Sequence, residues 1–161
     1  MGAHVISVVS TDDKARFVST VGSDEVVLAD GFKDVVKELT GGRGVDLIVD
    51  PVGGDRFTDS LRTLAPLGRL LVIGFTAGDI PTVKVNRLLL NNIASAASPG
   101  VPTRCPTSPR PQGWDVLTPY LDSGVVDPPI AGTYPLARTA EAVAQLDDRA
   151  VLGKVVVDPT L

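Results

Sequence analysis

Histidine and cysteine are almost absent from this chain: its 161 residues include one of each, His4 and Cys105. A single cysteine excludes a disulfide within the chain, and one histidine with one cysteine cannot supply the ligands of a zinc site. A nucleophile activated by histidine would depend on His4 alone. His4 begins an apolar segment, where a lone histidine is far more often structural than catalytic. We therefore predict no metal site and no catalytic side chain.

Excess basic charge and long hydrophobic runs are also lacking. The net charge is −4, which argues against a nucleic-acid binder because such proteins usually carry a basic face. No apolar run approaches the roughly 20 residues that a transmembrane helix needs. Met1 leads directly into a strand-like segment without the features of a signal peptide. We expect no nucleic-acid partner, no membrane partner and a cytoplasmic location.

Short β-branched segments alternate with amphipathic ones over the first half of the chain. HVISVV, EVVL, VDLIV and RLLVI are continuous apolar runs, which favour buried parallel strands. Strands and helices that alternate in this way form a parallel sheet covered by helices, so the predicted fold class is α/β. The pattern predicts strands over 4–9, 25–28, 45–49 and 69–73, and helices over 11–21, 32–40 and 55–64. In the second helix the residues of the apolar face are Phe32, Val35, Val36 and Leu39.

The second half of the chain has a different composition. Residues 94–113 contain five prolines among serine, alanine and arginine. Proline removes a backbone donor and fixes φ, so we expect neither a helix nor a central strand there. The remaining predicted elements are a helix over 85–93, a short helix from Trp114 that Pro119 interrupts, a turn-rich stretch around Pro128, a helix over 136–147 and a strand over 153–157.

Several segments together resemble the zinc-free quinone-oxidoreductase branch of the medium-chain dehydrogenase/reductase superfamily. They are GAHVISVVSTDDKARFV, ELTGGRGVDLIVDPVGGD, LAPLGRLLVIGFTAG, KVNRLLLNNI, and YPLARTAEAVAQLDDR followed by GKVVV. The resemblance implies a partial Rossmann-type parallel sheet that lacks its first strand and Gly-rich loop, with C-terminal elements of the catalytic domain. It divides the chain into a partial dinucleotide-binding domain (1–93), a Pro-rich irregular stretch (94–113), and C-terminal helices with a terminal strand (114–161).

The order of strands in such a sheet has consequences for exposed edges. The first strand of a 3-2-1-4-5-6 sheet lies between the second and the fourth. Without it, the strands predicted at 4–9 and 45–49 would each expose an unpaired apolar edge, which favours self-association. The terminal strand would also lack partners. Residues 94–113 stand where the resemblance implies a sixth strand, which suggests a hypothesis of an out-of-frame stretch between two compensating shifts.

Ser10 and Lys14 form an S-x-x-x-K pattern directly after the first predicted strand. A dinucleotide-binding sheet places that position beside the adenosine ribose, where an acidic residue favours NAD. A small hydroxyl followed by lysine suits a 2′-phosphate instead, so the resemblance implies NADPH. The alternative is a helix cap and a surface lysine. Some relatives add a tyrosine to this pocket, whereas this chain has Leu28-Ala29-Asp30 in the corresponding region.

Two further turns follow predicted strands, at the edge where ligands bind in open α/β sheets. The resemblance places both turns along the cofactor, with the second beside the nicotinamide. Plain structural turns are the alternative in each case, since glycine and proline are strong turn formers. Lys154 is a further phosphate candidate, although a surface lysine is the simpler interpretation. The turn residues are Asp50, Val52 and Gly53 in the first, and Gly74, Phe75 and Thr76 in the second.

The resemblance implies direct hydride transfer from NADPH to a small-molecule acceptor, a quinone or an α,β-unsaturated carbonyl compound. It places the acceptor between two domains, of which this sequence covers one side. A different class of function stays open: a truncated, non-catalytic remnant with weak or no nucleotide binding. A third hypothesis is a fragment that adds its exposed strands to a full-length relative.

Overall fold

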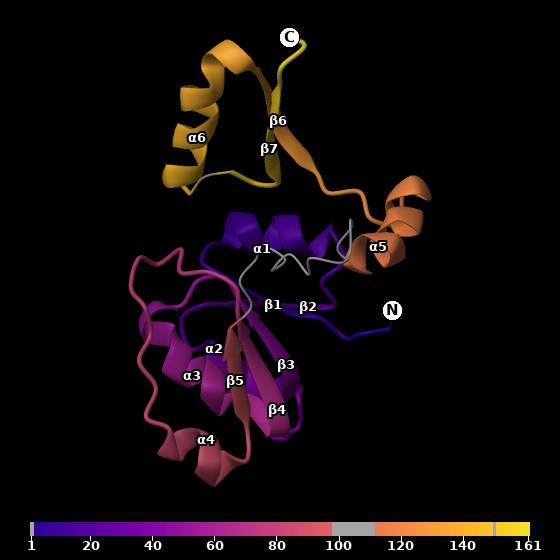
Figure 1. Cartoon of the computed structure of the whole chain (residues 1–161). Helices are drawn as coiled ribbons and strands as arrows, with labels where there is room; N and C mark the ends of the chain where they lie inside the picture. The colour runs from indigo at the N-terminus through magenta and orange to yellow at the C-terminus, as the bar shows by residue number, and fades with distance from the viewer. Residues whose placement is uncertain (1, 98–111, 150) are drawn as a thin grey trace.

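The computed structural model describes residues 2–97, 112–149 and 151–161, which form a mixed α/β structure (Figure 1). Three parallel sheets contain the strands β1 (Ile6–Val9) with β2 (Glu25–Leu28), β3 (Val45–Asp50) with β4 (Leu64–Val72) and β5 (Ala94–Ala97), and β6 (Ile130–Pro135) with β7 (Lys154–Asp158). The helices are α1 (Asp12–Ser19), α2 (Phe32–Leu39), α3 (Phe57–Arg62), α4 (Asn86–Asn91), α5 (Gln112–Asp122) and α6 (Thr139–Asp147), with 3₁₀ turns η1 (Gly54–Arg56) and η2 (Leu136–Arg138).

The main core lies on the three-stranded sheet, in which β4 is the central strand between β3 and β5 (Figure 1). Leu70 of β4 is fully buried, and Phe57 and Leu61 of α3 pack with it. Leu64, the last residue of the helix predicted over 55–64, is also buried but belongs to β4. The apolar face of α3 thus packs the helix against the sheet and positions the segment that connects β3 to β4.

A smaller core joins β2 to α2. Val27 of β2 is buried against Phe32 and Val36 of α2, and Ile6 of β1 and Val45 of β3 pack on the same cluster. Two residues of the same predicted helix face, Val35 and Leu39, remain 42% and 44% exposed. Helix α2 therefore contacts strands of both the first and the second sheet, although in the part of the chain that the structure describes these sheets do not pair with each other.

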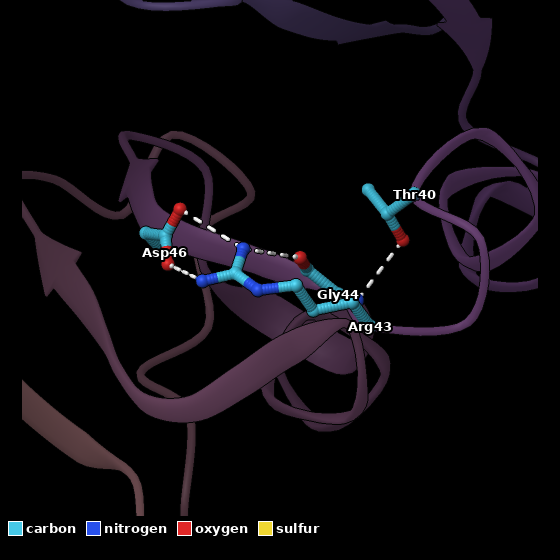
Figure 2. Close-up of polar contacts among 4 residues, drawn as sticks. All are labelled: Thr40, Arg43, Gly44 and Asp46. Atoms are coloured by element: carbon cyan, nitrogen blue, oxygen red, sulfur yellow. Dashed lines mark hydrogen bonds and ion pairs between the residues drawn. The ribbon is translucent and has the colours of Figure 1, made fainter.

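The turn between α2 and β3 is held by side chains of its own residues (Figure 2). Thr40 Oγ1 accepts the Gly44 N–H at 3.0 Å, and the Arg43 guanidinium pairs with both carboxylate oxygens of Asp46, with Nη1–Oδ2 at 3.1 Å. Gly44 has φ +91°, and a Cβ at this position would lie 2.5 Å from the Thr63 carbonyl oxygen. This GGRG turn lies at the amino end of β3, away from the edge where ligands bind, and its role is structural.

Neither β1 nor β3 has a strand partner on its second edge within the described residues. Leu47 and Val49 of β3 are 55% and 53% exposed, and Val8 of β1 is also exposed. Both edges carry apolar side chains, in agreement with the expected sheet that lacks its first strand. None of the helices that the structure describes is long and apolar enough to cross a membrane.

Residues 94–113 were expected to be irregular, with neither a helix nor a central strand, but their first residues form a strand at the edge of the three-stranded sheet. Ala94–Ala97 form β5, which pairs in parallel with Arg69–Val72 of β4. The first proline of the stretch is Pro99, so the preceding residues keep the backbone N–H groups that a strand needs. At the other end of the stretch, α5 begins at Gln112, although no helix was expected before Trp114. The rest of the expectation, and the hypothesis of an out-of-frame origin, concern residues 98–111, which lie outside the described ones.

The C-terminal part of the chain differs from the expectation in two respects. The terminal strand was expected to lack partners, but β7 pairs in parallel with β6, a strand that the turn-rich composition around Pro128 had concealed. Pro128 and Pro129 precede β6 and therefore remove no hydrogen-bond donor from it. Helix α5 was expected to stop or restart at Pro119, but it continues through that residue to Asp122.

Candidate functional site

Ser10 and Lys14 lie together at the carboxyl end of β1, where α1 begins. The Lys14 ammonium donates to Ser10 Oγ at 3.4 Å, and Thr11 caps the helix by accepting the Lys14 N–H at 3.3 Å. Ser10 is exposed and Lys14 is half-buried. Since Thr11 supplies the cap, the hydroxyl of Ser10 is not needed for it. A hydroxyl and a cation side by side at the positive end of a helix form a suitable pair for an anion.

The first of the two predicted turns is built around a buried carboxylate. Asp50 ends β3, and its Oδ1 accepts the backbone N–H groups of Val52 and Gly53, each at 2.9 Å. These bonds fix the turn and leave the carboxylate directed at its own backbone. Gly53 has φ +67°, and a Cβ there would lie 3.2 Å from a ring carbon of Phe75. A side chain at this position would therefore displace Phe75.

The second predicted turn runs alongside the first. The Ile73 N–H donates to the Asp50 carbonyl at 2.9 Å and the Thr76 N–H to the Pro51 carbonyl at 3.1 Å. Gly74 allows the close approach, since a Cβ there would lie 3.0 Å from the Pro51 carbonyl oxygen. The structure thus brings six of the eight predicted site residues into one unit at the carboxyl ends of β3 and β4: Asp50, Val52, Gly53, Gly74, Phe75 and Thr76.

Arg149 was not among the predicted site residues, yet it contacts this unit. It follows α6, has φ +53°, and its Nη2 donates to the Thr76 carbonyl at 2.9 Å. Arg149 and Leu152 also line an open groove of about 600 Å³ together with residues of α1, among them Lys14, Arg16 and Phe17. Arg149 therefore lies between the two groups of predicted residues. Arg149 reaches this position through a contact with a residue 73 positions away in the sequence, which no local sequence pattern predicts.

A second hollow, of about 390 Å³, lies where α2 and α3 begin. Its ionisable lining residues are Asp30, Lys33, Asp34, Asp55, Arg56 and Asp59. Four carboxylates against two cations make a poor environment for the phosphates of a dinucleotide. We therefore assign it no part in the candidate site.

The other polar candidates lie elsewhere. Lys154 is exposed at the start of β7, opposite Ile130 of β6. His4 precedes β1, which begins at Ile6 and not at His4 as expected, and its Nδ1 is 3.6 Å from a carboxylate oxygen of Asp24. Cys105 lies outside the described residues.

Comparison with known proteins identifies relatives over nearly the whole chain. A sequence model described as zinc-binding dehydrogenase matches residues 21–157. Quinone oxidoreductase-like protein 2 of Rattus norvegicus is 32% identical over 96% of this chain and 45% of its own length. The 2-haloacrylate reductase of Burkholderia sp is 29% identical over 99% of this chain and 49% of its own length.

Solved structures agree with these relatives. The quinone oxidoreductase of Pseudomonas syringae pv. Tomato DC3000 superposes with a TM-score of 0.86 at 26% identity, over 98% of this chain and 50% of that one. A 2-haloacrylate reductase structure gives a TM-score of 0.80 at 27% identity, over 99% of this chain and 51% of that one. The chain spans about half the length of the curated relatives it matches. It belongs to the zinc-binding dehydrogenase family and, within the medium-chain dehydrogenase/reductase superfamily, to the quinone-oxidoreductase branch.

Proposed function

We propose that the protein is an NADPH-dependent reductase of quinones or α,β-unsaturated carbonyl compounds, and that this chain holds the 2′-phosphate end of the nucleotide. The observation that carries the proposal is the Ser10–Lys14 pair at 3.4 Å, of which Lys14 lines a groove that Arg149 also lines. Two cations and a hydroxyl suit a phosphate dianion, and Ser10 stands where a carboxylate would favour NAD. Two relatives are named as reductases of α,β-unsaturated compounds, which supports this class of acceptor: the 2-haloacrylate reductase and the acryloyl-coenzyme A reductase of Sulfurisphaera tokodaii, the latter 26% identical to this chain.

The second unit suits the flat, uncharged part of a dinucleotide. Gly53 and Gly74 keep the turns free of side chains at their closest approach, and Phe75 is partly exposed beside them. When bound, the nicotinamide supplies a hydride to the acceptor. The role of Gly53, Gly74 and Phe75 is to hold that ring by shape and to exclude water from one of its faces.

A zinc ion does not fit this chain. Within residues 2–97, 112–149 and 151–161 there is no group of three or more histidine, cysteine, aspartate or glutamate side chains that could hold a metal ion. The whole sequence has one histidine and one cysteine. Zinc sites in proteins use three or four such ligands, most often histidine and cysteine.

A second candidate function is a chain without turnover that binds the nucleotide weakly and associates through its sheet edges. The exposed apolar side chains on the unpaired edges of β1 and β3 favour it, because such edges recruit further strands. In that case the family's chemistry would require protein surface that this chain does not supply.

Titration of the purified chain with NADPH and with NADH, followed by nicotinamide fluorescence, tests both candidates. We expect micromolar binding of NADPH and weaker binding of NADH. The Lys14→Ala variant should lose about 10- to 100-fold in NADPH affinity, the value of a hydrogen bond to a charged group, with little change for NADH. Lys37→Ala, which removes an exposed lysine from the last turn of α2, is the matched control. Equal affinity for both nucleotides would refute the 2′-phosphate site, and binding of neither would favour the second candidate.

A further inference from the structure

One hydrogen bond ties the C-terminal part of the chain to the turn after β4. Arg149 Nη2 donates to the Thr76 carbonyl at 2.9 Å, between residues 73 positions apart. Behind that carbonyl, the Thr76 N–H is bonded to Pro51 at 3.1 Å and the Ala77 N–H to Val52 at 3.0 Å. The turn after β4 is therefore held from two directions: its N–H groups bond to the segment after β3, and its Thr76 carbonyl bonds to the guanidinium of Arg149.

The same guanidinium belongs to a residue that lines the groove with Lys14. Arg16, a third cation of the groove, is paired with Asp13. By contrast, the hydrogen bonds formed by Lys14 and Arg149 go to neutral oxygens, the Ser10 hydroxyl and the Thr76 carbonyl. An anion offers the guanidinium a full negative charge, whereas the Thr76 carbonyl offers only a dipole. An anion in the groove would therefore compete with the Thr76 carbonyl for Arg149.

We propose that Arg149 couples the two ends of the site: a phosphate held by Ser10 and Lys14 draws the guanidinium away from the Thr76 carbonyl, which loosens the turn of Gly74, Phe75 and Thr76. The inference rests on the proposed function, because the anion is the 2′-phosphate of the nucleotide. The coupling is reciprocal, so part of the phosphate's binding energy opens the turn before the rest of the nucleotide enters it. A nucleotide fragment without a nicotinamide ring should then alter the distant turn.

Amide hydrogen exchange of Thr76 and Ala77, followed by NMR, tests the coupling on the full chain. The probe is adenosine 2′,5′-bisphosphate, and 5′-AMP, which lacks the 2′-phosphate, is its matched control. At saturation with the bisphosphate we expect both amides to exchange about two- to tenfold faster, the value of one hydrogen bond. 5′-AMP should leave both rates unchanged.

Two variants separate Arg149 from the general charge of the groove. Arg149→Ala should exchange about two- to tenfold faster at Thr76 and Ala77 without any nucleotide, and should show no further change when the bisphosphate is added. Arg16→Ala removes an equal charge from the same groove but no contact with the turn. In this variant Thr76 and Ala77 should exchange at the wild-type rate without nucleotide, and should still exchange faster at saturation with the bisphosphate. Both arginines are exposed, so neither change disturbs a core.

The outcomes distinguish the coupling from the function on which it rests. Calorimetry that detects no binding of the bisphosphate would overturn both. Binding with unchanged or slower exchange at Thr76 would overturn the coupling alone, because Arg149 would then bridge the phosphate and the carbonyl at once. Wild-type exchange rates in Arg149→Ala would also overturn it, whatever the nucleotide does.

Discussion

Replacing Gly44 by alanine should destabilise the protein more than the same change at any other glycine of the GGRG turn. Gly44 has φ +91°, and an added Cβ would lie 2.5 Å from the Thr63 carbonyl oxygen and 2.8 Å from the Ala65 nitrogen. Both are backbone atoms, so β3 and β4 must separate to admit a methyl group, which strains the 2.9 Å bond from the Val45 N–H to Thr63. The left-handed backbone costs alanine about 1–2 kcal/mol, and overpacking adds about 1–3 kcal/mol.

Gly42 provides the matched control in the same turn. Its φ is +82°, but a Cβ there would have no heavy atom within 4 Å. Gly42→Ala therefore carries only the backbone cost, about 1–2 kcal/mol, whereas Gly44→Ala should lose about 2–5 kcal/mol. Urea denaturation followed by circular dichroism measures both losses of stability, as shifts of the unfolding midpoint in variants whose m-value is unchanged. Equal losses in the two variants would refute the reasoning, because the close approach of β3 and β4 would then contribute nothing.

Two other predictions concern acid and association. The hydrogen bond from Arg43 lowers the pKa of Asp46, so the contribution of this pair to stability is present above the unfolded-state pKa of the carboxyl, about 4, and is lost as the pH falls through the folded-state value. The stability difference between wild type and Asp46→Asn should therefore shrink on acidification, and a difference independent of pH in urea titrations would contradict this. The double variant Leu47→Lys and Val49→Lys should reduce self-association, measured by light scattering, because it places charges at the edge of β3. Particle sizes equal to those of the wild type would show that the chain does not associate through that edge.

The parts of the fold that follow local patterns were predictable from the sequence. The strands and helices over residues 4–73 occur in the expected order, with shifted boundaries such as the start of β4 at Leu64, because buried parallel strands are continuous apolar runs. Phe32 and Val36 are buried as the helical period requires, but Val35 and Leu39 are not. Periodicity predicts which residues share a helix face, whereas the width of the buried face depends on the packed neighbours.

Two strands could not be predicted from composition, because each lies beside prolines that favour irregular structure. Ala94–Ala97 have small side chains next to a Pro-rich segment, and Ile130–Pro135 follow two prolines. Both become strands by pairing with a partner that is already placed, β4 and β7 respectively. Strand formation of this kind depends more on the neighbour than on intrinsic preference.

The candidate site divides in the same way. The contact of Ser10 with Lys14 is local, since the two residues stand four positions apart on either side of the helix cap Thr11, and their proximity follows from the sequence. The link from Arg149 to Thr76 depends on how distant segments pack, and no spacing in the sequence predicts it.

The parallel pairing of all described strands determines how the chain must fold. Ile6 pairs with Glu25, Val45 with Leu64, and Ile130 with Lys154, so each sheet closes only after an intervening helix has been made. The described residues contain no hairpin that could form early and guide the rest. Folds dominated by such non-local pairings fold slowly, because the entropy of loop closure is lost before the contacts form. The apolar strands therefore remain exposed for longer during synthesis than they would in a hairpin-rich protein of this size.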